Sequence, residues 1–336
     1  MYESTSSRLH KWKEMQSFIS NKKGDEYKIM SALVMLMGLS GSGKSTLAEE
    51  YAKLSGGKVF SSDKIREELF GNENDQTHNG EVFNELHKRI KKALRKNEIC
   101  IYDATNLNRN KRISFLRTLS DITCEKICMI VATPIEICIK RDQDRSRKVG
   151  KKVIHRQATQ FQIPLDYEGW NSIMIYNNPN FSASDYKRLI DYFPKAIMPH
   201  DCMPWHTESV QEHLNRTLVE MSLRTNEYYL LLASRYHDIG KFYTKTFYDR
   251  SKKMITDKAH YYGHENYGAY LFMTSRDFVT SGSFKPVFEK AWLLIALHME
   301  FGSRNSKVLK EIPKSAREAL ELLNECDTLG SIRGEI

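Results

Sequence analysis

Hydrophobic positions along residues 29–180 come in blocks whose spacing fits strands and helices in turn. The run YKIMSALVMLMGLS is almost continuously apolar and ends in glycines, which indicates a buried parallel strand that leads into a loop. Further strands are expected at KVFSSD, EICIYDATN, KICMIVAT and NSIMIY, and helices at STLAEEYAKLS, KIREELFG, NGEVFNELHKRIKKALRKN, NKRISFLRTLSD and PIEICIKRDQDRS. Strands that alternate with helices predict a doubly wound parallel α/β sheet.

The pattern changes at NNPNFSASDY, a segment of mainly Asn, Pro, Ser and Asp. Beyond it, helical spacing replaces the alternation with strands. Helices are expected at 206–221, 226–239, 263–274, 286–299 and 314–328. A chain of 336 residues is long enough for two domains. We therefore expect an N-terminal extension at 1–28, an α/β domain at 29–180 and an all-α domain at 181–336.

Charge and cysteine content indicate which binding partners and which cellular compartment to expect. The chain has 51 Lys plus Arg against 42 Asp plus Glu, a net charge of +9, which favours a polyanionic partner such as nucleic acid, although many basic proteins bind nothing acidic. Its six cysteines form no CxxC pair, as expected in a reducing compartment. No stretch approaches the roughly 18 apolar residues of a membrane helix. A soluble, cytoplasmic protein without a membrane partner is expected, and the sequence indicates no oligomeric state.

The segment GLSGSGKS fulfils the P-loop pattern GxxxxGK[ST], directly after a predicted strand and before a predicted helix. Its glycines let backbone N–H groups face phosphates, Lys44 reaches the β and γ oxygens, and the Ser45 hydroxyl can bind Mg²⁺. ATP and Mg²⁺ are therefore the expected cofactors. The expected ATP-binding residues of this loop are Gly38, Ser40, Gly41, Ser42, Gly43, Lys44, Ser45 and Thr46.

Polar residues also end the next two strands. Asp63 and Arg66 are three residues apart at the start of a helix, so both can lie on one face. A carboxylate there can accept the proton of an attacking hydroxyl while the guanidinium binds a phosphate, although an N-cap Asp beside a surface Arg is the alternative. Asp103 and Asn106 lie at the edge where doubly wound sheets bind ligands, although Asp103 could instead cap the helix at 108.

The densest positive charge lies in residues 140–156. Arg141 and Arg145 are one helical turn apart, so both can point at a triphosphate and neutralise charge in the transition state. A solvated helix face is the alternative reading. The run falls where P-loop kinases place a closing lid, which favours the first interpretation.

In the second half, YHDIGK places His237 and Asp238 side by side on a predicted helix. Adjacent side chains share a metal only when other helices complete the set of ligands. Other segments supply His206, His213, His264, His298 and Asp327. Any one of these residues could instead be a buried side chain held by hydrogen bonds and without a metal. Their joint presence on successive segments favours a metal site.

The segments GLSGSGKST, SSDKIREELFG, YDATNLNRNKR and IKRDQDRSRKVG together resemble the 5′-hydroxyl polynucleotide kinases of phage and bacterial RNA repair. The resemblance implies a P-loop kinase domain in which Lys44, Asp63 and Arg145 are catalytic, with Asp63 as the general base. It also implies acceptor contacts by Arg66, Asp103 and Asn106, and ATP contacts from the lid by Arg141 and Arg145. The long basic segment after Arg145 departs from that family.

The segments WHTESVQEH, HDIGK, GHENYGA, ALH and CDTLG resemble the HD phosphohydrolase superfamily. The resemblance implies an HD domain whose metal ligands are His213, His237, Asp238 and Asp327, with His264 and His298 available for a second ion. It further implies that His206 and Lys241 bind phosphate, and the choice of His213 over His206 as first ligand is provisional. Mixed histidine and carboxylate ligands suit Mn²⁺, Fe, Co²⁺ or Ni²⁺.

Together the two resemblances imply an RNA end-healing enzyme. Broken RNA can carry a 5′-OH on one side and a 2′,3′-cyclic phosphate on the other, so one chain would phosphorylate the first and hydrolyse the second before a separate RNA ligase joins them. One alternative is a nucleoside or sugar kinase fused to an HD nucleotidase. The other is an ATP-gated regulatory HD protein, which leaves Asp63 and Arg66 unexplained.

Overall fold

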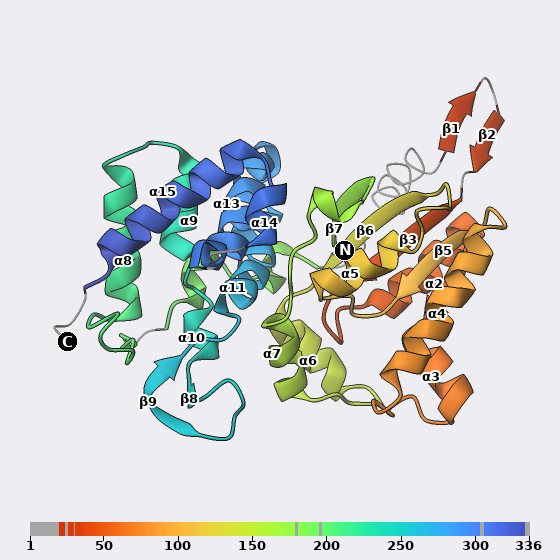
Figure 1. Cartoon of the computed structure of the whole chain (residues 1–336), viewed down its shortest axis with the longest axis horizontal. Coiled ribbons are helices and arrows are strands. Elements are labelled where there is room, and N and C mark those ends of the chain that lie inside the picture. Colours follow the sequence, from red (N-terminus) through yellow and green to blue (C-terminus); the bar gives the residue numbers. More distant parts are fainter. Residues whose placement is uncertain are drawn as a thin grey trace. The chain divides into compact units, whose positions relative to one another are not determined.

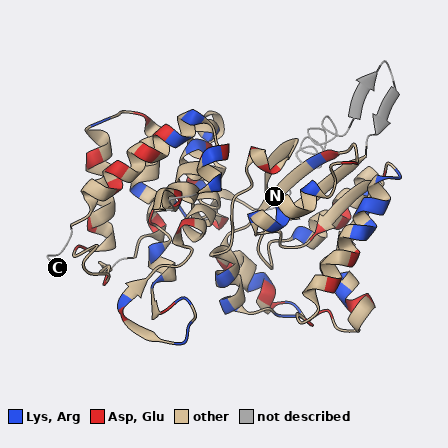
Figure 2. Ribbon diagram, viewed as in Figure 1, with Lys and Arg blue, Asp and Glu red and all other residues tan. Residues whose placement is uncertain are grey.

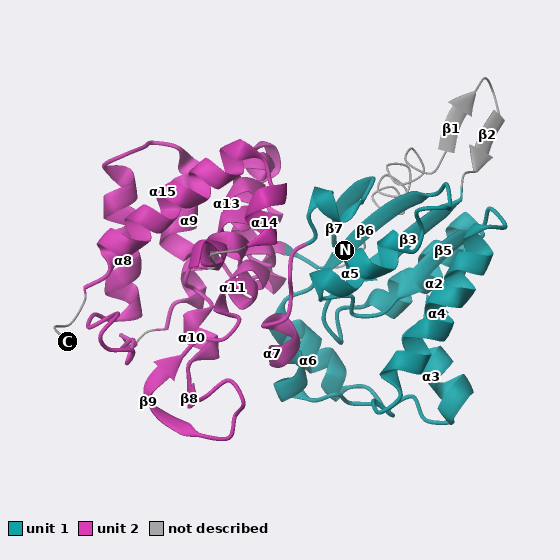
Figure 3. Ribbon diagram, in the orientation of Figure 1, with its two compact units in different colours: residues 1–154, 164–182 teal, residues 155–163, 183–336 magenta. Residues whose placement is uncertain are grey.

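The computed structural model describes residues 20–23, 26–29, 31–178, 181–194, 197–302 and 306–332, and side chains from residue 31 onward (Figure 1). The chain divides into two compact units, residues 1–154 with 164–182 and residues 155–163 with 183–336 (Figure 3). The segment 155–163 thus joins the second unit, although the sequence pattern places it before the domain boundary. Of the expected N-terminal extension, residues 1–19 lie outside the described part.

The first unit is built on five parallel strands in the order β4-β5-β3-β6-β7. Their bounds are β3 Ala32–Met37, β4 Lys58–Ser61, β5 Ile99–Asp103, β6 Glu125–Ala132 and β7 Ser172–Asn177. The central strand β3 pairs with β5 on one side and β6 on the other. The sheet confirms the expected parallel α/β architecture. Before it, β1 (Ser20–Lys23) and β2 (Glu26–Ile29) pair as an antiparallel hairpin.

Both faces of β3 are buried, because every side chain from Ala32 to Met37 is at most 1% exposed. On one face the strand packs with Leu47, Ala48 and Tyr51 of the helix that follows the P-loop. A strand covered on both sides has no polar face, which is why its sequence is continuously apolar. The helices of this unit are α2 Lys44–Ser55, α3 Ser62–Phe70, α4 Asn79–Leu94, α5 Arg109–Arg117 and α6 Ile135–Gln143, and α7 (Lys151–Ala158) runs into the second unit's segment.

A buried ion pair fixes the turn after β5. Both oxygens of Glu168, in the 3₁₀ helix η1 (Asp166–Glu168), accept hydrogen bonds from Arg112 of α5, Nε at 2.8 Å and Nη2 at 2.7 Å. The remaining nitrogen of Arg112, Nη1, donates to the carbonyls of Asn106 (3.0 Å) and Leu107 (3.1 Å). One arginine therefore ties the segment before β7 to the turn that carries Asn106, one of the predicted site residues.

The second unit is mainly helical. Its helices are α8 Val210–Ser222, α9 Tyr228–Tyr236, α10 Lys241–Thr244, α11 His264–Met273, α12 Arg276–Val279, α13 Lys285–Leu297, α14 Lys307–Glu311 and α15 Lys314–Gly330, with 3₁₀ turns η2 Ala183–Asp185, η3 Leu189–Tyr192, η4 Gly282–Phe284 and η5 His298–Gly302. None of the helices in the described part of the chain is long and apolar enough to cross a bilayer.

Two sequence expectations for this unit need correction. Strands β8 (Thr246–Tyr248) and β9 (Ile255–His260) form an antiparallel hairpin, so the unit is not all-α. Helix α8 starts at Val210, because the Ser209 side chain accepts from the backbone of Glu212 while the Glu212 carboxylate accepts from the backbone of Ser209. His206 therefore lies in the preceding loop and not on a helix.

Candidate active sites

The P-loop lies between β3 and α2 and depends on glycine. Gly41 has φ +82°, and a Cβ at this position would lie 2.3 Å from the carbonyl oxygen of Cys138 in α6. That close approach excludes any side chain, because a backbone oxygen cannot move away cheaply. Arg141 supports the same loop, since its Nη1 lies 3.4 Å from the Gly41 carbonyl oxygen and 3.2 Å from that of Ser42.

Lys44 and Ser45 face the space that a nucleotide phosphate occupies in P-loops. Lys44 Nζ donates to the carbonyl of Leu39 at 2.7 Å, and burial lowers the pKa of this ammonium group against the pull of Asp103. Ser45 Oγ donates to Asp103 Oδ2 at 2.8 Å. A hydroxyl beside a carboxylate offers the oxygen ligands that Mg²⁺ prefers, so the donor set fits the expected ion.

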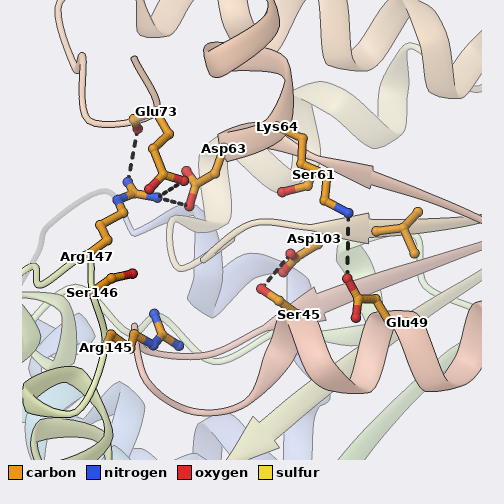
Figure 4. Close-up of a pocket in the computed structure, with 11 residues that line it drawn as sticks. Ser45, Glu49, Ser61, Asp63, Lys64, Glu73, Asp103, Arg145, Ser146 and Arg147 are labelled. Atoms are coloured by element: carbon orange, nitrogen blue, oxygen red, sulfur yellow. Dashed lines mark hydrogen bonds and ion pairs between the residues drawn. The ribbon is translucent and has the colours of Figure 1, made fainter. Parts of the chain in front are cut away.

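The acceptor side centres on Asp63 in the first turn of α3. Its Oδ1 accepts from Arg66 Nη1 at 2.6 Å and its Oδ2 from Arg147 Nη1 at 2.6 Å. Figure 4 shows the Arg147 guanidinium turned onto the Asp63 carboxylate, with Glu73 beside it. Asp63, Glu73 and Arg147 line a cavity of about 370 Å³ that is also lined by Ser45, Asp103 and Arg145. The structure thus brings the predicted base and the P-loop to one cavity.

Arg147 is a site residue that the sequence reasoning did not single out. Besides Asp63, it binds Asn74 Oδ1 through Nε at 2.7 Å and the Glu73 carbonyl through Nη2 at 3.0 Å. Its place in the basic run was visible in the sequence, but no spacing rule selects it. The reason is that α6 ends at Gln143, so Arg145 and Arg147 lie on an irregular segment. The expectation that Arg145 lies one helical turn after Arg141 is therefore wrong.

Asp142 explains why this segment leaves the helix. The side chain is 2% exposed, and its two oxygens accept from the backbone N–H groups of Val149 (3.0 Å) and Gly150 (2.8 Å). The carboxylate therefore folds residues 144–150 into a closed loop. That loop directs Arg145 and Arg147 to the cavity.

Two of the predicted acceptor-binding residues, Arg66 and Asn106, also form hydrogen bonds within the protein. Arg66 is 3% exposed and also donates to Asn79 Oδ1 at 3.0 Å. Asn106, expected at the acceptor, directs its amide to the Leu36 carbonyl of β3 at 2.8 Å. Neither helix-cap alternative describes the structure, because Ser61 is the N-cap of α3 and Asn108 is the N-cap of α5.

In the second unit, the predicted metal ligands converge on Asp238. Its Oδ2 lies 3.5 Å from the Nε2 atoms of both His213 and His237, while its Oδ1 lies 3.0 Å from His264 Nε2 and 3.5 Å from His298 Nε2. Asp327 Oδ1 completes the first group, 2.8 Å from His213 Nε2 and 3.3 Å from His237 Nε2. These residues come from α8, the end of α9, α11, the end of α13 and α15.

The histidine rings are held in a form that suits a cation. Three of them direct Nδ1 to a backbone carbonyl: His237 to Ser234 at 3.0 Å, His264 to Tyr261 at 2.7 Å and His298 to Ile295 at 2.8 Å. A carbonyl only accepts, so each Nδ1 carries a proton and each Nε2 is directed toward the centre.

Nε2 atoms of the centre then face each other in pairs. The Nε2 atoms of His264 and His298 are 3.1 Å apart, and those of His213 and His237 are 3.3 Å apart. Metal–nitrogen bonds of about 2.1 Å place ligand nitrogens roughly 3.0–3.4 Å apart, so both spacings fit a bound divalent metal. Two groups of the described residues, each including Asp238, could therefore hold a metal ion.

The electrostatics of the centre also favour positive charge. Burial lowers the pKa of His237, but the carboxylates of Asp238 and Asp327 outweigh it and raise that pKa to about 10. Burial raises the pKa of both carboxyl groups, yet Lys241 beside Asp238 and His237 beside Asp327 hold them well below their usual range. The carboxylates thus stay ionised and attract a proton or a metal.

One wall of the centre contains two residues that the sequence reasoning missed. His200 is 1% exposed and stacks on His206 at 4.0 Å between ring centroids, and its Nε2 lies 3.4 Å from Lys241 Nζ. Glu208, 6% exposed, accepts from His206 Nδ1 at 2.7 Å and lies 3.6 Å from His213 Nδ1. Both sit among polar loop residues outside any helical pattern, so no periodicity distinguishes them. Burial lowers the pKa of His200 to about 2, so this ring is neutral.

Comparisons with known proteins match part of the chain. Residues 33–164 match the sequence model of a family described as an AAA domain. The chain is 26% identical over 145 residues to the L-seryl-tRNA(Sec) kinase of Methanococcus maripaludis, an alignment that covers 41% of this chain and 56% of that kinase. The chain thus spans little more than half the length of this curated relative.

Solved structures also align with part of the chain. A gluconokinase from Sinorhizobium meliloti 1021 is 16% identical, with 45% of this chain and 84% of that chain covered and a TM-score of 0.33. A chain of the Pnkp1/Rnl/Hen1 RNA repair complex is 22% identical, with 42% and 47% covered and a TM-score of 0.36. At these TM-scores, neither of the two solved structures indicates the substrate of this protein. The family match and the sheet make residues 33–164 a kinase-like P-loop domain.

Proposed function

We propose that this protein heals broken RNA ends. The kinase domain, assigned to residues 29–180, phosphorylates a 5′-OH end, and an HD phosphohydrolase domain, assigned to residues 181–336, hydrolyses a 2′,3′-cyclic phosphate or 2′-phosphate end. The observation that carries the proposal is the pairing, in one chain, of a P-loop cavity containing an arginine-held carboxylate with a buried histidine and carboxylate centre around Asp238. Cleavage that leaves a 5′-OH and a cyclic phosphate creates a need for both reactions.

In the kinase domain, Asp63 accepts the proton of the attacking hydroxyl. Arg66 and Arg147 reach the same carboxylate, so either guanidinium can bind a phosphate next to that hydroxyl. Lys44 and Arg145 lie on the side of the triphosphate and offset the charge that grows during transfer. Ser45 and Asp103 would hold Mg²⁺, which would neutralise part of the phosphate charge.

In the HD domain, His213, His237, Asp238 and Asp327 hold one ion, and His264 and His298 share Asp238 with a second. A bound Mn²⁺, Fe, Co²⁺ or Ni²⁺ supplies a water of lowered pKa and neutralises the phosphate under attack. Lys241 and His206 lie on the wall next to this centre and bind the phosphate oxygens. Glu208 orients His206 by accepting its Nδ1 proton.

Two further considerations support a polynucleotide substrate. The curated relative acts, by its name, on an RNA-borne acceptor, and the net charge of +9 favours a polyanion. A separate RNA ligase in the cytoplasm would then seal the healed ends. A small-molecule kinase with an HD nucleotidase and an ATP-gated HD protein remain the competing functions.

The kinase test compares γ-phosphate transfer from ATP to a 5′-OH oligoribonucleotide and to free nucleosides. We expect the oligonucleotide to be labelled and the nucleosides to be poor acceptors. Asp63→Asn should lower turnover by a factor on the order of 100 or more while nucleotide binding persists, because only proton acceptance is lost. Preferred labelling of nucleosides would instead support the small-molecule kinase, and no transfer to either acceptor would support the regulatory protein.

The hydrolase test uses RNA that ends in a 2′,3′-cyclic phosphate or a 2′-phosphate, incubated with the purified chain and Mn²⁺, Co²⁺ or Ni²⁺. We expect phosphate loss from the wild type and none from His237→Ala, whose kinase activity should be unchanged. Intact termini under every metal condition, with an active kinase, would refute the hydrolase assignment.

A further inference from the structure

The chain between two residues of the HD centre forms the β8–β9 hairpin. Lys241 begins α10 just before it, and His264 begins α11 just after it. The hairpin is anchored at its base, because Ala259 N donates to the Asp201 carbonyl at 2.7 Å and the Tyr261 hydroxyl donates to the carbonyl of His200. The hairpin is therefore a direct extension of the wall that contains His200 and Lys241.

The hairpin tip is shaped by one carboxylate. Asp249 Oδ1 accepts from the backbone N–H groups of Lys253 (2.9 Å) and Met254 (3.1 Å), and Asp249 Oδ2 accepts from the Ser251 hydroxyl. The backbone N–H of Asp249 donates to the Met254 carbonyl at 2.9 Å. These bonds occupy the only acidic group of the turn itself and leave the basic side chains of the tip facing outward.

The surface of the hairpin is basic and aromatic. Four cationic side chains lie on the outer surface of the hairpin: Arg250, Lys252, Lys253 and Lys258. In the described part of the chain, none of these four has an ion pair. Figure 2 shows Lys and Arg on both edges of the hairpin. Large side chains lie exposed between them: Phe247 (40%), Tyr248 (48%), Met254 (67%), Ile255 (74%) and Tyr262 (37%).

Some of these rings already stack on cationic or aromatic groups. The Arg250 guanidinium lies 5.9 Å from the Tyr262 ring centroid, and His260 stacks on Tyr262 with centroids 5.1 Å apart and an angle of 11°. Lys245 Nζ lies 5.8 Å from the Phe247 centroid. Flat, exposed rings beside cations are the combination that binds single-stranded nucleic acid, because each base has a flat face for stacking and each phosphodiester linkage carries a negative charge.

We propose that the β8–β9 hairpin binds the single-stranded RNA next to the 3′ end that enters the HD centre. The proposal rests on the proposed function and adds the surface by which the HD centre would select a polynucleotide over a mononucleotide. Phe247, Tyr248 and Tyr262 stack on bases, while Lys252, Lys253 and their neighbours contact phosphates. An exposed protein-binding surface would need no such excess of unpaired positive charge.

The test compares two substrates of the HD centre in the full chain, an oligoribonucleotide with a 2′,3′-cyclic phosphate and a 2′,3′-cyclic mononucleotide. Variants are Phe247→Ala with Tyr248→Ala, and Lys252→Ala with Lys253→Ala. The matched control replaces two exposed lysines of α14, Lys307→Ala with Lys310→Ala. Thermal unfolding of each variant checks that the unit stays folded.

For the aromatic variant, we expect kcat/KM on the oligonucleotide to fall by at least roughly 30-fold, because each of the two lost stacking contacts contributes about 5- to 150-fold. Activity on the mononucleotide should be unchanged, as should both activities of the control. For the lysine variant, the slope of log affinity against log salt should weaken by about 1.4, the value for two phosphate contacts of a single strand. Affinity is measured by fluorescence anisotropy with labelled oligonucleotide, which needs no hydrolysis.

Equal losses on both substrates would assign the hairpin to the stability of the centre and overturn the proposal. Unchanged oligonucleotide activity and affinity in both variants would also overturn it, and would leave the hairpin as a protein-binding surface. A wild type that hydrolyses neither substrate refutes the proposed hydrolase alone, since anisotropy still decides whether the hairpin binds the strand.

Discussion

Glu168→Gln tests whether the buried ion pair holds the kinase domain together. The Glu168 side chain is fully buried and accepts from Arg112 Nε and Nη2, Trp170 Nε1 (3.1 Å) and the backbone N–H of Leu165 (3.0 Å). Arg109 Nε lies 3.6 Å away. Glutamine keeps the shape but removes the negative charge and turns an NH₂ group toward these donors.

The expected loss follows from the buried charge that remains. Removal of one partner from a buried ion pair costs about 3–5 kcal/mol, because the guanidinium of Arg112 stays buried without a counter-charge. For a unit of this size that corresponds to a fall in Tm of about 6–20 °C. The turn at Asn106 and Leu107 should loosen as well, because Arg112 Nη1 holds both carbonyls. Phosphoryl transfer should therefore fall at temperatures where the domain is still folded.

The assay is thermal and urea unfolding of the full chain. The transition that an ATP analogue shifts to higher temperature or urea concentration is assigned to the first unit. Glu67→Gln, an exposed position on α3, is the matched control and should change stability by less than about 0.5 kcal/mol. A loss below about 1 kcal/mol in Glu168→Gln would refute the reasoning. It would mean that water or a shift of Arg112 compensates the missing charge.

Three more predictions concern the two sites. Lys44→Ala should abolish phosphorylation of the 5′-OH and leave HD hydrolysis intact, measured on the same preparation with both RNA ends. Gly240→Ala should reduce bound metal per chain, measured by elemental analysis, because its Cβ would lie 2.0 Å from the His264 carbonyl oxygen and push α10 from α11. Chelation should lower the Tm of the helical unit, and a transition metal at 100 times its Kd should restore about 2.7 kcal/mol of stability, measured by calorimetry.

Much of the architecture follows from periodicity, because long elements repeat their pattern often enough to be recognised. The apolar run of β3 and the helical spacing of α8, α9, α11, α13 and α15 are of this kind. The β8–β9 hairpin is not, because a strand of three residues and a strand with two consecutive exposed charges have no distinct apolar face. Short elements depend on contacts with distant residues, here Asp201 and His200. Such contacts cannot be predicted from the local sequence pattern.

The same distinction applies to the sites. His237 and Asp238 could be proposed as ligands because further histidines and Asp327 occur on successive segments of the sequence. The partnership of Asp63 with Arg147 could not be predicted, since it depends on the loop that Asp142 folds over residues 144–150. His200 and Glu208 were missed for a similar reason: they act through burial behind other ligands, and burial of loop residues is a tertiary property.

The wide separation of the proposed metal ligands along the chain would set an order of events during biosynthesis. His213 and Asp327 lie within 2.8 Å of each other but roughly a hundred residues apart in sequence. At 5–20 residues per second, several seconds or more pass between the synthesis of one and of the other. Throughout that interval the nascent helical unit holds an incomplete set of ligands, whereas the P-loop and its sheet are already synthesised. The kinase half can thus mature first, and metal capture marks the completion of the second half.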